Sequence, residues 1–73
     1  MRAKPLAPIG RAIKKRLIDL DKNQLWLVEQ VKHATGLYFD SAYLQKIMTG
    51  VLKTPGILLA IREILDIPED ADP

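Results

Sequence analysis

The chain has 73 residues, of which 48% are hydrophobic and 27% charged, with one histidine and no cysteine. A chain of this length forms one small domain with a marginal core. The lack of cysteine excludes disulfides and thiolate metal sites and is typical of a reducing compartment. No apolar run approaches the roughly 20 residues that span a bilayer. We therefore expect a cytoplasmic protein with no metal, no cofactor and no membrane segment.

The net charge of +2 is unevenly distributed along the sequence. Residues 2–53 contain ten basic and four acidic residues, a net charge of +6, whereas residues 54–73 contain one basic and five acidic residues, a net charge of −4. A basic body favours a polyanion such as nucleic acid as the partner, with the acidic end turned away from it. Ordinary solvated surface charge gives a similar balance, so the charge distribution alone favours nucleic-acid binding only slightly.

Four segments carry apolar residues at helical spacing and predict a small all-α domain. We expect helices over about 9–20, 24–34, 41–49 and 55–65. Leu58 and Leu65 are expected to lie to one side of the last helix. The residues predicted to face the core are Ile9, Ile13, Leu17, Leu20, Leu27, Val28, Val31, Ala34, Leu44, Ile47, Met48, Ile57, Ala60, Ile61 and Ile64.

Polar residues and glycine mark where these helices begin and end. Asn23 is expected to cap the second helix, and either Asp40 or Ser41 the third. Thr54, which precedes a proline, opens the fourth. Gly36 stands where a left-handed residue ends a helix.

The regions flanking the helices have a different composition. Residues 1–8 predict a flexible basic arm and residues 68–73 an acidic disordered tail, which leaves 9–67 as the folded domain. Within that domain Trp26, Tyr38 and Phe39 are predicted to cover the edge of the core.

No residue pattern of an enzyme is present. The serines and threonines fall at helix ends, the carboxylates are scattered, and the sequence contains neither a glycine-rich phosphate loop nor a His-Glu metal spacing. We expect a binding protein.

Several short runs follow one another in a characteristic order: Lys15-Arg16-Leu17-Ile18-Asp19-Leu20, Asn23-Gln24, Trp26-Leu27, Thr35-Gly36-Leu37-Tyr38, Ser41-Ala42-Tyr43-Leu44-Gln45-Lys46-Ile47, Thr49-Gly50 and Ala60-Ile61-Arg62-Glu63-Ile64-Leu65. Their order over residues 10–67 resembles the Cro/Xre-type helix-turn-helix proteins, the DNA-binding domains of phage repressors and bacterial regulators. The similarity is greatest to short Xre-type proteins of Gram-positive bacteria and their mobile elements. It implies a lambda-repressor-like domain of four helices, or five.

The resemblance also implies roles for individual residues. The third helix, about 41–49, would enter the DNA major groove, and the residues facing base edges would be Ser41, Ala42, Gln45 and Lys46. Gln and Lys can bond the edges of adenine and guanine, and Ala can touch a thymine methyl. The residues facing DNA phosphates would be Gln24, Tyr43, Thr49, Lys53 and Thr54, although Tyr43 could instead pack against the loop.

The chain departs from the family in two respects. The connection that we place over 32–40 is longer than the usual turn before the recognition helix, and no fifth helix follows the fourth. A surface for a homodimer or another partner would then come from Leu58, Leu65 and Trp26, with Ile18 as a further candidate.

The sequence thus favours a sequence-specific, double-stranded DNA-binding transcriptional regulator, such as a repressor. Two alternatives on the same fold remain open. The first is a protein-interaction module that binds another regulator, as an antirepressor or antitoxin would. The second is an architectural or excision factor that bends DNA without regulating transcription.

Overall fold

The computed structural model describes residues 6–68, which form four helices and no strand. The helices are α1 (Pro8–Leu20), α2 (Gln24–Thr35), α3 (Ser41–Met48) and α4 (Pro55–Leu65). The predicted all-α fold with four helices is confirmed, and each predicted boundary lies within one residue of the observed one. The predicted tail beyond residue 68 and the first five residues of the predicted arm lie outside the described residues.

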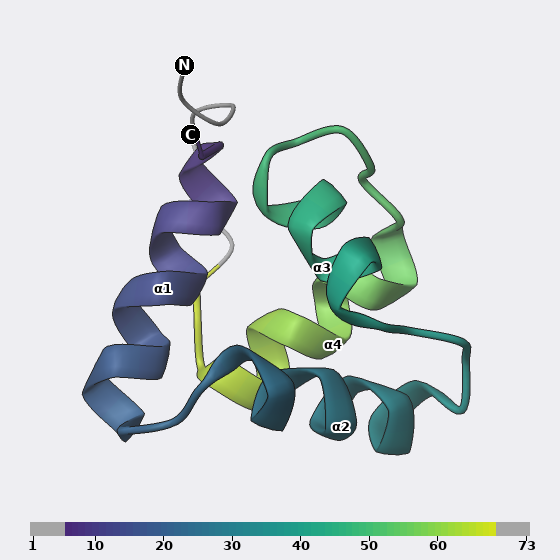
Figure 1. Ribbon diagram of the computed structural model, residues 1–73, viewed down its shortest axis with the longest axis horizontal. Coiled ribbons are helices and arrows are strands. Elements are labelled where there is room, and N and C mark those ends of the chain that lie inside the picture. The colour runs from purple at the N-terminus through teal and green to yellow at the C-terminus, as the bar shows by residue number, and fades with distance from the viewer. Residues whose placement is uncertain (1–5, 69–73) are drawn as a thin grey trace.

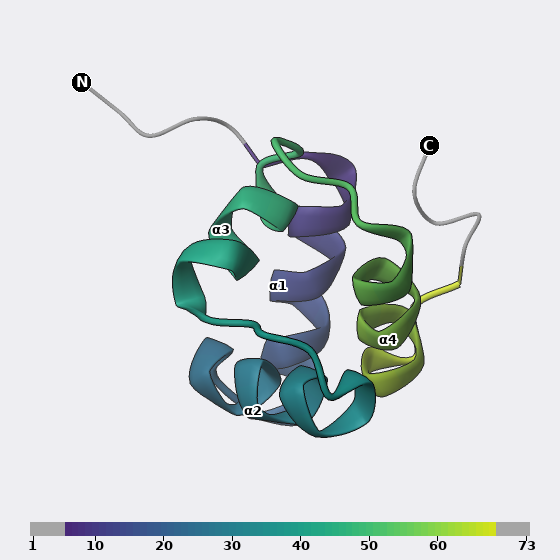
Figure 2. The ribbon, with the colours of Figure 1, turned by 90° about the vertical axis from the view of Figure 1, so that its right-hand side faces the viewer.

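The helices enclose one core. In Figure 1, α1 stands at the left, α2 runs to the right along the bottom from near the lower end of α1, and α3 and α4 fill the space beside α1 and above α2. Both α1 and α2 pack against α3 and α4. Figure 2 shows α3 and α4 on opposite sides of the molecule, with α1 behind and between them and α2 below. The ten largest fully buried side chains are Ile13, Leu27, Val31, Phe39, Leu44, Ile47, Met48, Ile57, Ile61 and Leu65.

Four of the core predictions are wrong or only partly right. Leu20 and Ala34 are exposed because each lies in the last turn of its helix, where neighbouring residues are exposed as well. Leu65 is fully buried and Ile64 only half-buried, because the inner stripe of α4 continues at four-residue steps from Ile57. Leu65 is therefore unavailable as a surface for a dimer or another partner.

The predicted helix ends follow ordinary capping chemistry. Asn23 Oδ1 accepts a hydrogen bond from the Trp26 backbone N–H at 2.8 Å, and Asp40 Oδ1 accepts one from the Tyr43 N–H at 2.8 Å. Asp40, rather than Ser41, is thus the cap of α3. Gly36 ends α2 in the left-handed region, at φ 68°, where glycine meets no steric penalty. The connection between α2 and α3 is therefore only 36–40, shorter than the 32–40 that we expected.

A close backbone approach joins the start of α1 to the end of α3. Gly10 is buried, and a Cβ atom placed on it would lie 2.2 Å from the carbonyl oxygen of Met48. Beside it, the Ala7 N–H donates to that same oxygen at 2.9 Å. Leu6 and Ala7, which we placed in the arm, pack partly against the core, and Pro8 begins α1.

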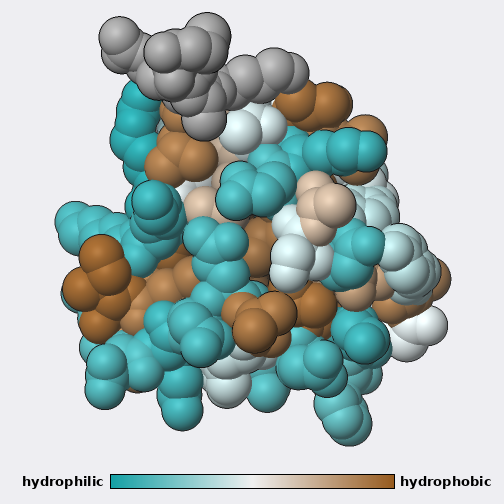
Figure 3. Space-filling view, viewed as in Figure 1, coloured by the Kyte–Doolittle hydropathy of each residue, from teal (hydrophilic) through white to brown (hydrophobic). Residues whose placement is uncertain are grey.

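Large hydrophobic side chains also reach the surface. Figure 3 shows them gathering beside the C-terminal half of α1, along α2 and at the upper right, separated by hydrophilic side chains. Ile18, which we named as a further candidate for a partner surface, is 76% exposed. The other exposed large hydrophobic residues are Leu20, Leu25, Leu37, Tyr38, Val51, Leu52 and Leu59.

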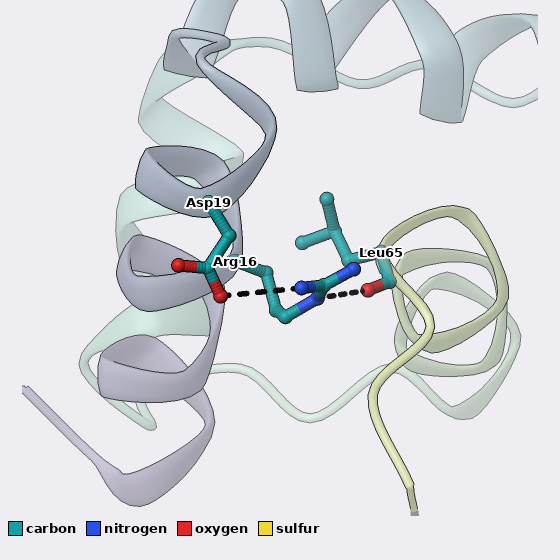
Figure 4. A network of polar contacts seen from close by, with 3 residues as sticks. All are labelled: Arg16, Asp19 and Leu65. Carbon is teal, nitrogen blue, oxygen red and sulfur yellow. Dashed lines mark hydrogen bonds and ion pairs between the residues drawn. The ribbon is translucent and has the colours of Figure 1, made fainter.

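An arginine ties α1 to the end of α4. The Arg16 Nε–H donates to the Leu65 carbonyl oxygen at 2.7 Å, and Nη1 lies 3.2 Å from Asp19 Oδ2 (Figure 4). Leu65 is the last residue of α4, so its carbonyl is one of those that the helix itself leaves without a donor. Arg16 supplies that donor from another helix.

Candidate nucleic-acid interface

The outer face of α3 carries the four residues that we predicted to meet base edges. Ser41, Ala42, Gln45 and Lys46 are all exposed. They stand at positions i, i+1, i+4 and i+5, which share one face of a helix. The opposite face, made by Leu44, Ile47 and Met48, is buried. In Figure 3, the side chains over α3 are hydrophilic or intermediate in hydropathy.

The N-terminal end of α3 is held by a carboxylate with two donors. Asp40 Oδ1 caps the helix, and Asp40 Oδ2 accepts a hydrogen bond from the Tyr38 hydroxyl. The hydroxyl of Tyr38 and the backbone N–H of Tyr43 hold the pKa of Asp40 below its ordinary value. The same bond to Asp40, together with the charge of that carboxylate, raises the pKa of Tyr38. The carboxylate is therefore charged and the phenol neutral at neutral pH.

The two neighbouring aromatic residues have opposite environments. Phe39 is buried as predicted, and its ring centroid lies 4.9 Å from that of Tyr43. Tyr38 is 74% exposed, so the prediction that it covers the core is wrong. Its hydroxyl reaches Asp40 instead, which turns the ring away from the interior. The ring of Tyr38 is therefore exposed next to the start of α3, and no sequence pattern predicted that exposure.

Tyr43 and Thr54 share one hydrogen bond. The Tyr43 hydroxyl lies 2.8 Å from Thr54 Oγ1, and either atom can be the donor. Two hydroxyl groups carry two protons, and their mutual bond uses one of them. The pair can therefore offer one O–H to a phosphate, where we had expected a contact from each residue. The Thr54 side chain makes no cap hydrogen bond to α4.

The other residues predicted to meet phosphates differ in availability. Lys53 is exposed. Thr49 is half-buried, and its hydroxyl donates to the Gln45 carbonyl oxygen at 3.0 Å, so that its proton is already used. Gln24 is half-buried at the start of α2.

Gln24 lines a hollow of about 260 Å³ between α1 and α2. Lys14 and Lys22 also line this hollow, and we had assigned neither of them to a site from the sequence. They come together because Asp21, which follows the last residue of α1, is in the left-handed region at φ 58°, and the chain turns there towards α2. The residues that line the hollow are Lys14, Leu17, Ile18, Lys22, Asn23 and Gln24.

The predicted partner surface is not one continuous patch. Leu58 is half-buried and lines a separate hollow of about 140 Å³ with Ala7, Ile47 and Leu52, among others. Trp26 is half-buried against the core, as predicted, and Lys22 Nζ lies 5.6 Å from its ring centroid.

Two further features of the described residues bear on function. None of the helices in 6–68 is long and apolar enough to cross a membrane. Within the same range, no three His, Cys, Asp or Glu side chains are grouped so as to hold a metal ion.

Comparison of the chain with protein-family models, curated proteins and solved structures gives no match.

Proposed function

We propose that the protein binds double-stranded DNA in a sequence-specific manner through α3 and acts as a transcriptional regulator. The observation that carries the proposal is the two-sided character of α3. One face is fully buried, and the other exposes Ser41, Ala42, Gln45 and Lys46 together. The major groove is wide enough to admit such a helix, and these side chains match the hydrogen-bonding groups and methyl groups exposed there.

The arrangement around α3 supports a groove-bound position. A helix that enters the groove needs phosphate contacts on either side of it. Lys53 and Thr54 follow α3 in the chain, and Gln24 precedes it. Thr54 is hydrogen-bonded to Tyr43 of α3, and the pair has one hydroxyl proton free. In Figure 2, α3 and the first turns of α2 both lie on the left side of the molecule, so one duplex could meet both.

A selection from random duplex DNA tests the proposal. We expect enrichment of one sequence. Gln45→Ala and Lys46→Ala should each weaken binding to that sequence by about 1–3 kcal/mol, because each removes a contact to a base edge. Gln30→Ala and Lys32→Ala are matched controls, since they remove the same residue types from α2 and should have little effect. Recovery of no preferred sequence would contradict the proposal.

A protein-interaction module is the second candidate, and the exposed apolar residues favour it. Ile18 and Leu25 are 76% and 65% exposed, and exposed apolar surface is typical of a partner site where it is contiguous. This function predicts binding to a protein partner that is insensitive to salt and is weakened by Ile18→Ser and Leu25→Ser. DNA affinity in the same variants should be unchanged if α3 is the DNA-binding element.

A further inference from the structure

We propose that the hollow between α1 and α2 is a phosphate-binding site, in which Lys14 and Lys22 bind the phosphodiester backbone of the nucleic acid. The inference rests on the proposed function and assigns it two contacts outside α3. The lining combines the two ammonium groups with the side-chain amides of Asn23 and Gln24 and the apolar carbons of Leu17 and Ile18. This lining is complementary to a sugar-phosphate chain, in which negatively charged phosphates alternate with the carbon atoms of the sugars.

The charges of the two lysines are available to an external anion. In the described part of the chain, the ion pairs are Arg16 with Asp19 and Lys32 with Glu29, and neither lysine of the hollow takes part in one. Asp19, the acidic residue of α1 near this end, is therefore already occupied by Arg16. No acidic residue lines the hollow.

The amide groups at the rim add hydrogen-bond donors. Asn23 Oδ1 accepts from the Trp26 N–H, which fixes the side chain and leaves its NH₂ group outside the cap. Gln24 follows directly at the first position of α2. Donors of this kind hold a phosphate oxygen in place, whereas the lysines supply the charge.

The start of α2, which forms one border of the hollow, lies on the side of the molecule where the duplex is proposed to bind. In Figure 2, the N-terminal end of α2 is on the left, on the same side as α3. A duplex whose major groove holds α3 would then bring its backbone to the hollow. Lys14 and Lys22 should contribute to affinity equally for all sequences, because phosphates carry no base information.

Salt dependence of binding to the selected duplex tests the site. Each phosphate contact contributes about 0.9 to the slope of log K against log salt, so Lys14→Gln/Lys22→Gln should make the slope shallower by about 1.8. The matched control is Lys15→Gln/Lys32→Gln, which removes two exposed charges from α1 and α2, outside the hollow. It should keep the wild-type slope. Lys22→Arg, which preserves the charge, should keep it too.

Trp26 provides a second readout, since it is the single tryptophan of the chain and Lys22 Nζ lies over its ring. Duplex binding should change its emission in the wild type and in the Lys15→Gln/Lys32→Gln control, and leave it nearly constant in Lys22→Gln.

Two further measurements complete the test. Circular dichroism would check that each variant is folded. Lys14→Gln alone should make the slope of log K against log salt shallower by half as much as the double variant does.

The failures of the two proposals are distinguishable. If the wild type binds duplex DNA but Lys14→Gln/Lys22→Gln has the slope of the control pair, the phosphate site is contradicted and the function proposed for α3 stands. If the wild type binds no duplex, both are contradicted. A change in base preference in Lys14→Gln/Lys22→Gln would also contradict the site, because phosphate contacts act on all sequences alike.

Discussion

Gly10 and Gly56 both lie in the first turn of a helix, yet their surroundings are opposite. A Cβ atom on Gly10 would lie 2.2 Å from the backbone oxygen of Met48, whereas one on Gly56 would meet nothing within 4 Å. Helix propensity alone favours alanine over glycine by about 1 kcal/mol at a helical position. At Gly10 the contact is with backbone, which cannot rotate away, so packing opposes propensity.

We therefore expect substitutions at the two glycines to have opposite signs. Gly10→Ala should lower the free energy of unfolding by about 1–3 kcal/mol, the usual range for an overpacked interior. Gly56→Ala should raise it by about 0.4–1 kcal/mol, because alanine restricts the unfolded chain. Urea denaturation of both variants measures these changes. Equal effects would show that the approach of α1 to α3 is not tight.

Asp40 should make stability depend on acid pH. Because its folded pKa is below the ordinary value, its bonds contribute fully above the unfolded pKa of about 3.9 and are lost as the pH falls through the lower folded pKa. The stability difference between the wild type and Asp40→Asn should thus shrink below about pH 4. Urea midpoints across the acid range measure it.

Tyr38→Phe is the control for this pH dependence. The Tyr38 hydroxyl makes the largest contribution to the lowered pKa of Asp40, so its removal should reduce the loss of stability on acidification. A difference between the wild type and Asp40→Asn that is constant with pH would contradict the account of this cap.

Residue types at helix ends were predictable, because capping is a local interaction. Asn23 needed only the three following residues to bond Trp26, and the same holds for Asp40 and Tyr43. The sequence could not predict which of Tyr38 and Phe39 is buried and which is exposed, because the two residues are adjacent and both are aromatic. Which of them faces inward depends on the direction in which the chain leaves Gly36.

At the scale of the helices, Arg16 is the polar link that joins α1 to the C-terminal end of α4. Arg16→Met keeps the aliphatic stem and removes the guanidinium, which leaves the Leu65 carbonyl without this donor. The side chain is 32% exposed, so we expect a loss of about 1–2 kcal/mol, near the low end for hydrogen bonds to charged groups.

Asp19→Asn separates the two contacts of Arg16. It removes the ion pair and leaves the bond to Leu65, and since Asp19 is 49% exposed the loss should be within about 0.5 kcal/mol. Thermal or urea denaturation gives both values. A larger loss for Asp19→Asn than for Arg16→Met would contradict the assignment of the link to the carbonyl.

Helix periodicity predicted the elements well and their last turns poorly. The spacing of Ile9, Ile13 and Leu17 predicted the buried face of α1, but extending it to Leu20 failed. Periodicity describes one helix, whereas burial of a final turn depends on how far the neighbouring helix reaches. The same limit led us to place Leu65 at the surface.

At the scale of the whole molecule, the candidate interface combines predictable and unpredictable parts. The exposed face of α3 follows from its sequence, because its buried residues fix which side remains outside. The Tyr43–Thr54 bond and the hollow that contains Lys14 and Lys22 join residues whose contact requires the complete fold. No local pattern could have assigned these residues to a common site.

The base preference of α3 variants tests the central claim most directly. Selections from random duplex DNA would be performed in parallel with the wild type, Gln45→Ala and Lys46→Ala, with Gln30→Ala as the control. If α3 reads bases, each α3 variant should lose preference at one or two adjacent base pairs and keep it elsewhere, while the control reproduces the wild-type sequence. An identical preferred sequence for all four proteins would contradict the claim.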